Sequence, residues 1–356
     1  MSSSLTQEQQ LWSASTCGNL GLVRLLTLHP AVNVNWIGPE KGDTPLHRAC
    51  RFGHVPVVEF LLKHKQVDVN AGNARQATPF IIACQEGHNE VVSLLQADTR
   101  TDVNKPQLEG CTPFFVACAT GNHEMVSLLQ ADLRVDVNRA KNTGSTPFFF
   151  ACMHGHKKVV SQLLADKRLE VNKPKNDQCT PLWIASQNGH LPVVQLILVY
   201  GRDVNTKTKS IAGTMTWNNK TAAEMARCQG TILRDEDESE EEYSGRKHNG
   251  PLIAALIDSF EADPATTRQQ LRELPELRDP FIGDLFALVI FLCEGLLSVG
   301  AESSTSNKAV RFFRIAQALP MELQMVLCNR VFGSGKDHVL TKHSEPAFKK
   351  LGSLFH

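Results

Sequence analysis

Three features of the sequence could support chemistry: a loop with Gly and Lys near the C-terminus, ten cysteines and thirteen histidines. The loop, residues 333–337, carries the glycines and the lysine of a phosphate-binding loop. It lacks the leading Gly at the required spacing, the Ser or Thr that should follow the Lys, and an apolar strand before it. We therefore expect no nucleotide to bind there.

Four of the cysteines recur at a spacing of 34 residues: Cys50, Cys84, Cys118 and Cys152. Residues that occupy one site of a repeat lie on stacked helices, about 8–10 Å apart. A disulfide needs Cα atoms within about 7 Å, and a zinc–sulfur bond is about 2.3 Å long. The spacing therefore predicts small buried side chains rather than disulfides or a metal site.

The histidines and acidic residues form no recognisable catalytic or metal-binding group. Most histidines fall in equivalent positions of a repeat, and none is grouped with Cys or carboxylates at metal-ligand spacing. Asp and Glu are scattered along loops, so no acid–base pair can be named, and neither a nucleophile-elbow nor a kinase motif occurs. The sequence predicts a protein that is not an enzyme and that has no cofactor and no metal.

Charge and hydropathy narrow the range of partners. Lys plus Arg and Asp plus Glu number 37 each, so the neutral chain carries no electrostatic signal for nucleic acid. The longest apolar run, residues 285–293, is nine residues long, whereas a membrane-spanning helix needs about 20. Residues 1–10 are polar and lack the pattern of a secretory signal. We expect no membrane insertion and a cytoplasmic protein, with the nucleus as the alternative.

A period of 34 residues runs through the first two-thirds of the chain. Each unit begins with Thr-Pro, has a Gly nine residues after the Thr, and continues with an apolar cluster followed by Val-Asn. A unit this small cannot bury its apolar face alone, so successive units must stack. The Thr residues that begin the units are Thr44, Thr78, Thr112, Thr146 and Thr180.

The residue types in each unit have physical reasons. Thr caps a helix through its hydroxyl, and Pro in the first helical position lacks only an amide that would have no partner. Gly permits the left-handed residue that ends a first short helix. Val and Leu at positions i, i+3 and i+4 then give a second helix with one apolar face. The unit is a helix-turn-helix followed by a loop, and the predicted fold class is all-α.

This pattern, with Thr-Pro-Leu-His at residues 44–47 and Gly-His at residues 53–54, resembles the ankyrin repeat. The resemblance implies a solenoid of about six to seven repeats, capped by residues 11–35 and ended by a truncated repeat at residues 217–226. The usual ankyrin period is about 33 residues. The residue added here precedes each Val-Asn, in a loop where it should not disturb the stack.

The motif His is present only at His47. Its place in the later units is taken by Ile81, Phe115, Phe149 and Trp183. Two interpretations are open. These side chains pack between units in place of the usual local hydrogen bond, or they line an aromatic groove for a ligand.

The repeat ends before the C-terminal third, and three segments are predicted. Residues 1–233 form the ankyrin-repeat domain, residues 234–249 an acidic flexible linker, and residues 250–356 a small helical domain punctuated by Pro. The linker prediction rests on seven acidic residues within residues 234–243. Residues 319–327 resemble the opening of an F-box, and this implies an alternative function as a substrate-recognition adaptor of a ubiquitin ligase.

The favoured function is a protein–protein interaction scaffold or adaptor that binds a macromolecular partner, a protein of unknown identity. The resemblance implies contacts at the tips of the loops between repeats and just before each helix-ending Gly. On this chain the loop-tip residues are Lys41, Arg75, Glu109, Thr143 and Asp177, and the groove residues are Arg51, Phe52, Gln85, Glu86, Ala119, Thr120, Met153, His154, Gln187 and Asn188. Because the set is chemically mixed, the sequence predicts no charge for the partner.

Overall fold

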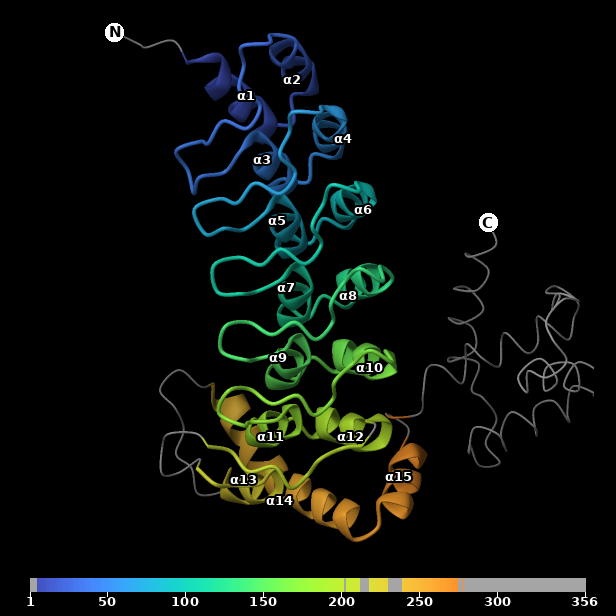
Figure 1. The fold of residues 1–356 in the computed structure, drawn as a ribbon. Coiled ribbons are helices and arrows are strands. Elements are labelled where there is room, and N and C mark those ends of the chain that lie inside the picture. The colour runs from blue at the N-terminus through green and yellow to red at the C-terminus, as the bar shows by residue number, and fades with distance from the viewer. Residues whose placement is uncertain (1–4, 202, 212–217, 230–238, 275–276, 278–356) are drawn as a thin grey trace, which may run out of the picture. The chain divides into compact units, whose positions relative to one another are not determined.

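The computed structural model describes residues 5–201, 203–211, 218–229, 239–274 and 277 (Figure 1). This part of the chain contains helices and no strand, as the repeat pattern predicts. The chain divides into two compact units, Met1–Glu261 and Ala262–His356. The first unit contains the repeats.

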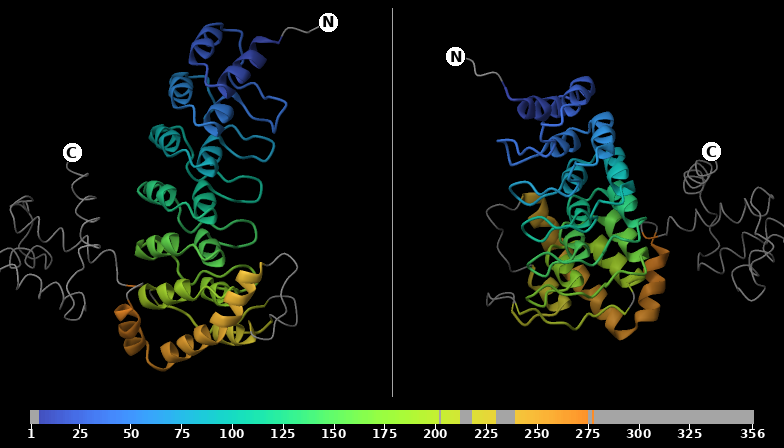
Figure 2. Two further views of the ribbon diagram at one scale, coloured as in Figure 1. Left: turned by 180° about the vertical axis from the view of Figure 1, so that it is seen from behind. Right: turned by 45° about the horizontal axis from the view of Figure 1, so that its top comes forward.

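Each repeat contributes two helices, which form two stacked rows (Figures 1 and 2). The inner row, from which the connecting loops project, consists of α1 (Gln7–Thr16), α3 (Pro45–Arg51), α5 (Pro79–Glu86), α7 (Pro113–Ala119), α9 (Pro147–Met153) and α11 (Pro181–Gln187). The outer row consists of α2 (Leu20–Thr27), α4 (Val55–Lys63), α6 (Asn89–Ala97), α8 (His123–Gln130), α10 (Lys157–Ala165) and α12 (Leu191–Tyr200). Helix α13 (Ala222–Cys228) adds to the inner row and contacts α11.

The inner helices from α3 to α11 begin as the motif predicts. Thr112, for example, caps α7 by accepting a hydrogen bond from the main-chain N–H of Phe115 at 3.1 Å, and Pro113 follows in the first turn. At the other end of such a helix, Gly87 has a φ of 79° and ends α5 in the left-handed region that Gly tolerates. The boundaries of these short helices therefore follow from local residue types.

The core lies between the two rows and between successive repeats. Phe80, Phe114 and Phe148 are buried at equivalent positions of three inner helices. The cysteines of the 34-residue ladder are also buried, and burial raises the pKa of each thiol because a buried thiolate would lose its hydration. The eight described cysteines are free thiols. The ladder residues are small core side chains, as predicted.

The position of the motif His is a core position in every repeat. The side chains at this position are at most 3% exposed in Ile81, Phe115, Phe149 and Trp183. This burial favours packing between repeats over an aromatic ligand groove. His47 keeps the usual polar contacts, because its Nδ1 lies 2.8 Å from the Thr44 hydroxyl and its Nε2 donates to the Ala77 carbonyl at 2.9 Å.

The loop that holds the extra residue of the 34-residue period connects neighbouring repeats. Arg134 forms an ion pair with Asp132 at 2.7 Å and donates to the main-chain oxygen of Gln96, in the preceding repeat, at 2.6 Å. The pairs Asp98–Arg100 and Asp166–Arg168 make the equivalent contacts. We call these three pairs the loop clasps. The insertion was expected only to leave the stack undisturbed, whereas its loop also holds consecutive repeats together.

The Asn of each Val-Asn pair makes a second connection between neighbouring repeats. Asn104 donates to the Arg134 carbonyl at 2.7 Å and accepts from the main-chain N–H of Asp136 at 2.9 Å. Asn35, Asn70 and Asn138 make the same two bonds to the repeats that follow them. The regular spacing of this Asn along the chain thus has a structural reason, because each of these Asn side chains forms hydrogen bonds across a repeat boundary.

The loop clasps predict that part of the stability is lost in acid. Burial opposes ionisation of Asp166, but hydrogen bonds from Arg168 and Gln130 outweigh it and lower its pKa from 3.8 to about 2. Because the folded-state pKa lies below the unfolded value, the interaction stabilises the fold above about pH 4 and is lost as the pH falls toward 2. We expect the difference in free energy of unfolding between wild type and Asp166→Asn, measured with urea, to shrink as the pH falls from about 5 to about 3. A difference that stays constant over this range would contradict the role of the clasp.

The C-terminal end of the first unit differs from the prediction of a flexible linker through residue 249. Residues 240–249 are the first part of α14 (Glu240–Ala262), whose acidic first turn lies at the positive end of the helix dipole. Asn249 donates through Nδ2 to the Gly189 carbonyl at 2.9 Å, and Arg246 donates through Nη1 to Oε1 of Gln229 at 2.6 Å. These contacts with the last repeats give the segment partners that its charge pattern does not reveal.

Several predictions concern residues outside the described part of the chain. These are the rest of the acidic segment, residues 234–238, the apolar run at 285–293, the F-box-like residues 319–327 and the loop at 333–337. In the second unit the structure describes α15 (Pro264–Glu273). Among the described helices, none combines the length and the hydropathy that a membrane crossing requires.

Candidate functional site

The predicted loop-tip residues form one continuous row along the loops. The carbonyl of each accepts a hydrogen bond from a main-chain N–H of the next loop. The pairs are Lys41 with Ala74 at 2.9 Å, Arg75 with Leu108 at 2.9 Å, Glu109 with Asn142 at 3.1 Å, Thr143 with Asn176 at 3.3 Å and Asp177 with Ile211 at 2.7 Å. Residues 34 apart in the sequence are therefore neighbours in space, and we call them the tip row.

The predicted groove residues lie at the C-terminal ends of the inner helices, on the same side as the loops. Phe52, Gln85, Glu86, Thr120 and His154 are exposed. The other five, Arg51, Ala119, Met153, Gln187 and Asn188, are half-buried. None of the ten is fully buried, and the 47% exposure of Phe52 is large for an aromatic side chain. Together with the tip row they form a surface that runs along the inner helices.

A groove of about 530 Å³ lies between the tips and the inner helices α3, α5 and α7. It brings together six of the predicted residues, namely Lys41, Arg51, Arg75, Gln85, Ala119 and Thr120. It does not include the predicted residues of the later repeats, from Met153 to Asn188 and from Thr143 to Asp177. The structure therefore concentrates a hollow site on the first half of the predicted surface.

The floor of this groove includes residues that the sequence interpretation missed. Ile82 and Val116 line it, four residues after the capping Thr of their helices. Phe150 and Ile184 hold the equivalent positions in the next two repeats and are half-buried. The signal that could have found them is an apolar residue at this position in four consecutive repeats, where Arg48 stands in the repeat before them.

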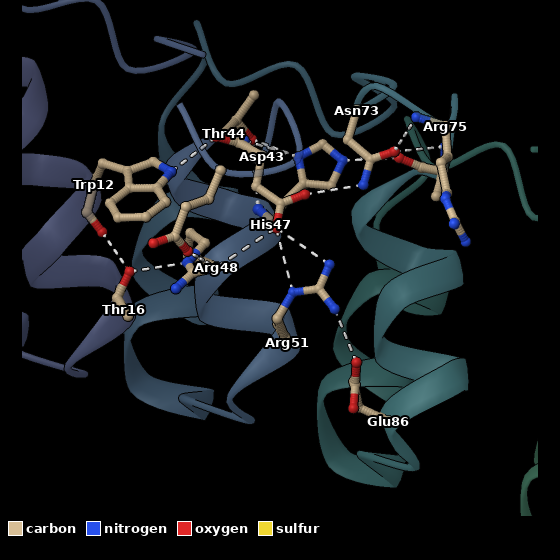
Figure 3. Close-up of polar contacts among 12 residues, drawn as sticks. Trp12, Thr16, Asp43, Thr44, His47, Arg48, Arg51, Asn73, Arg75 and Glu86 are labelled. Atoms are coloured by element: carbon tan, nitrogen blue, oxygen red, sulfur yellow. Dashed lines mark hydrogen bonds and ion pairs between the residues drawn. The ribbon is translucent and has the colours of Figure 1, made fainter. Parts of the chain in front are cut away.

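Arg51 is held by an ion-pair network at one end of the groove (Figure 3). Its Nε and Nη2 donate to Oδ2 of Asp43, both at 3.2 Å, and its Nη1 donates to Oε1 of Glu86 at 2.9 Å. The Asp43 side chain is completely buried, and that of Arg51 is only 14% exposed. Arg51 therefore connects α3 to α5, and its charge is compensated within the protein, which the repeat pattern does not indicate.

Asp43 is the centre of the same network (Figure 3). Its Oδ1 accepts from Asn73 Nδ2 at 2.9 Å, and its Oδ2 lies 3.8 Å from Nη1 of Arg48. Arg48 also donates to the Thr16 hydroxyl at 3.0 Å and lies 4.3 Å from the ring centre of Trp12. The network thus connects the N-terminal repeat to the two that follow it.

Aromatic side chains continue the surface toward the later repeats. Phe150 lies 4.7 Å from Phe115 and 5.7 Å from His154, measured between ring centres, and Nζ of Lys141 lies 4.6 Å from the Phe150 ring centre. Burial lowers the pKa of His154, and neighbouring His156 lowers it further. A half-buried ring beside a neutral imidazole presents apolar area with a polar edge, which suits contact with a protein chain.

The chemical groups around the groove are few. In the part of the chain that the structure describes, no three His, Cys, Asp or Glu side chains gather to hold a metal ion. The charged groups that line the groove are Arg51, which is paired with Asp43 and Glu86, and Lys41 and Arg75, which are exposed on the tip row. What the surface offers is a hollow with an apolar floor, a row of exposed tips and half-buried aromatic rings.

Comparison with known proteins agrees with this architecture. The sequence profile described as "Ankyrin repeats (3 copies)" matches residues 10–107, 65–140, 96–173 and 114–208, which together span more than half of the chain. Among solved structures, the ankyrin repeat domain of human ASB11 matches with 24% identity and a TM-score of 0.50, covering 66% of this chain and 96% of that one. An ankyrin repeat domain from Acinetobacter baumannii matches with 25% identity and a TM-score of 0.49, covering 54% of this chain and 97% of that one. No curated protein sequence matches.

Proposed function

The chain belongs to the ankyrin-repeat family, and from that membership we propose that it is a protein-binding scaffold that holds a partner on the surface formed by its tip row and inner helices. Ankyrin repeats generally mediate protein–protein interaction. The same backbone accommodates unrelated partners, so the site has to be argued from the side chains of this chain.

The observation that supports this proposal most directly is the set of large side chains exposed on the surface. Phe52 is 47% exposed, and exposed His154 occupies the equivalent position three repeats later, next to half-buried Met153. The Phe52 ring lies 5.0 Å from the Arg48 guanidinium and 6.1 Å from the His54 ring, yet nearly half of the residue stays open to contact with a partner. Binding energy in protein interfaces concentrates in a few large side chains of this kind. We propose that binding, without catalysis, is the function of this surface.

The proposal is tested by measuring partner binding to single-residue variants of the full chain. A partner is first captured by proximity labelling, purified, and titrated against Phe52→Ala, Met153→Ala and His154→Ala. We expect at least one variant to bind about tenfold more weakly or worse, since removing a central large side chain costs about 2 kcal/mol. Thermal unfolding should change little, because none of the three side chains is fully buried.

The matched controls are Glu90→Ala and Glu124→Ala, exposed residues on outer helices α6 and α8. They should leave binding unchanged, since the outer row lies away from the loops (Figure 1). A partner that binds all three surface variants normally, but not a chain that ends at residue 261, would place recognition elsewhere and refute the proposed site.

A further inference from the structure

The groove between the first loops has a charge of one sign. Lys41, Arg51 and Arg75 line it, and no Asp or Glu is among its lining residues. Lys41 and Arg75 belong to adjacent tips that are joined by the hydrogen bond from Ala74 N to the Lys41 carbonyl. A partner that enters this hollow therefore meets positively charged side chains first.

Only two of these three cations are available to a partner. The charge of Arg51 is compensated by buried Asp43 and by Glu86. The side chains of Lys41 and Arg75 are exposed, and neither makes an ion pair or side-chain hydrogen bond with the described residues. The next tip carries Glu109, which has the opposite sign and limits the cationic part of the surface to these two repeats.

The floor below the two cations is apolar. Ile82, Val116, Phe115 and Ala119 line it, with Val116 and Ala119 half-buried and thus open to contact. Around them, Gln85, Gln107 and Thr120 add hydrogen-bonding groups. An apolar floor with polar groups at fixed places and charges of one sign above it favours a ligand that carries an apolar side chain beside negative charge.

We propose, building on the proposed function, that this groove binds an extended segment of a partner protein in which an apolar side chain is flanked by acidic residues. The apolar side chain lies on Ile82 and Val116, and the carboxylates lie against Lys41 and Arg75. Stacked repeats are about 8–10 Å apart, and an extended chain advances about 3.3 Å per residue. Carboxylates about three residues apart on the partner therefore match the two cations.

Selection of random displayed peptides against the full chain tests this inference. We expect the enriched sequences to combine Leu, Ile, Val or Phe with two or more Asp or Glu. One enriched peptide is then synthesised and titrated by fluorescence anisotropy. The double variant Lys41→Glu, Arg75→Glu should weaken its binding about tenfold or more, since it places like charges together in the groove.

The matched control is the double variant Lys65→Glu, Lys167→Glu, which makes the same charge change on exposed residues of the loops after the outer helices α4 and α10. It should alter binding less than about twofold, because exposed charges more than about 10 Å away are screened by salt. Circular dichroism spectra of both variants should match wild type, so that loss of binding reports the groove and not unfolding.

Three outcomes overturn the inference. If the enriched peptides are basic or uncharged, the groove selects another chemistry. The same conclusion follows if the double variant Lys41→Glu, Arg75→Glu binds them as tightly as wild type does. If no peptide is enriched, while binding of a captured partner still requires Phe52, Met153 and His154, the groove is not the peptide-binding site but the proposed function is unaffected. A synthetic peptide of residues 234–243 is also used as a competitor. If it displaces a labelled enriched peptide at the same concentration as the unlabelled enriched peptide does, the groove is assigned to the chain's own acidic segment.

Discussion

Replacing Asp43 with alanine is expected to lower the free energy of unfolding by about 3 kcal/mol, the lower end of the range for breaking a buried ion pair. The carboxylate is completely buried and accepts hydrogen bonds from Arg51 and Asn73. Without it, the Asn73 amide and the Arg51 Nε–H lose their partner inside the protein. The effect stays at the lower end because Arg51 keeps its ion pair with Glu86 and Arg48 keeps its ion pair with Glu40.

Urea denaturation of the full chain, followed by far-ultraviolet circular dichroism, measures this change. The control is Glu59→Ala, which breaks the ion pair with Lys63 at 2.7 Å, where both side chains are more than half exposed. An exposed pair of this kind contributes less than about 1 kcal/mol. Equal losses for Asp43→Ala and Glu59→Ala would mean that the buried network does not hold the first three repeats together.

Replacing Phe114 with alanine is expected to destabilise the protein by about 3–5 kcal/mol. Phe114 lies on α7 in the middle of the stack and is 1% exposed, so its removal loses buried apolar area and leaves a cavity. Phe52→Ala is the same substitution at an exposed ring and provides the matched control. There we expect a loss below about 1 kcal/mol, mainly from contact with Arg48, whose guanidinium lies 5.0 Å from the ring centre.

The two phenylalanine variants also test the repeat register. They are compared by urea denaturation under identical conditions, with the denaturant midpoint and slope both recorded. If Phe52→Ala destabilises as much as Phe114→Ala, the side of the inner helices that carries Phe52 is core, and the surface assigned to partner binding is wrong.

The helix pairs could be predicted from the sequence because their signals are local. Thr112 caps its own helix, and Gly87 ends the helix that precedes it. The position of the tip row also followed from the sequence, because one position in each repeat of a regular stack falls on one line in space. A period of 34 residues therefore predicts which positions of successive repeats lie side by side. It does not predict which side chains form ion pairs or hydrogen bonds with one another.

The charge of the groove could not be predicted, because it depends on which side chains pair. In the sequence, the predicted site residues include three basic ones, Lys41, Arg51 and Arg75, and three acidic ones, Glu86, Glu109 and Asp177, so the set shows no net charge preference. The structure pairs Arg51 with Asp43 and Glu86 and leaves the other two cations exposed. This pairing is a property of tertiary geometry, since Arg51 and Glu86 belong to different repeats.

The first residues of α14 were missed for a related reason. A run of acidic residues usually marks exposed, flexible chain. Here Arg246 and Asn249, which follow the run, find partners in Gln229 and the Gly189 carbonyl. A linker prediction based on charge alone does not take account of such contacts, because the partners lie 17 and 60 residues earlier in the chain.

The loop clasps give the central repeats connections that the end repeats lack. They join the four repeats that begin at Thr44, Thr78, Thr112 and Thr146, and no clasp follows on either side: His64 and Tyr200 stand where the acidic residue would be. A solenoid unfolds by breaking interfaces between neighbours, so partial unfolding that begins at an end is expected to stop at the clasped block. At the N-terminal end it must also break the contacts of Arg48 with Thr16 and Trp12. The groove above α3, α5 and α7 lies entirely within that block. The proposed site is thus expected to keep its shape if the ends of the solenoid unfold locally.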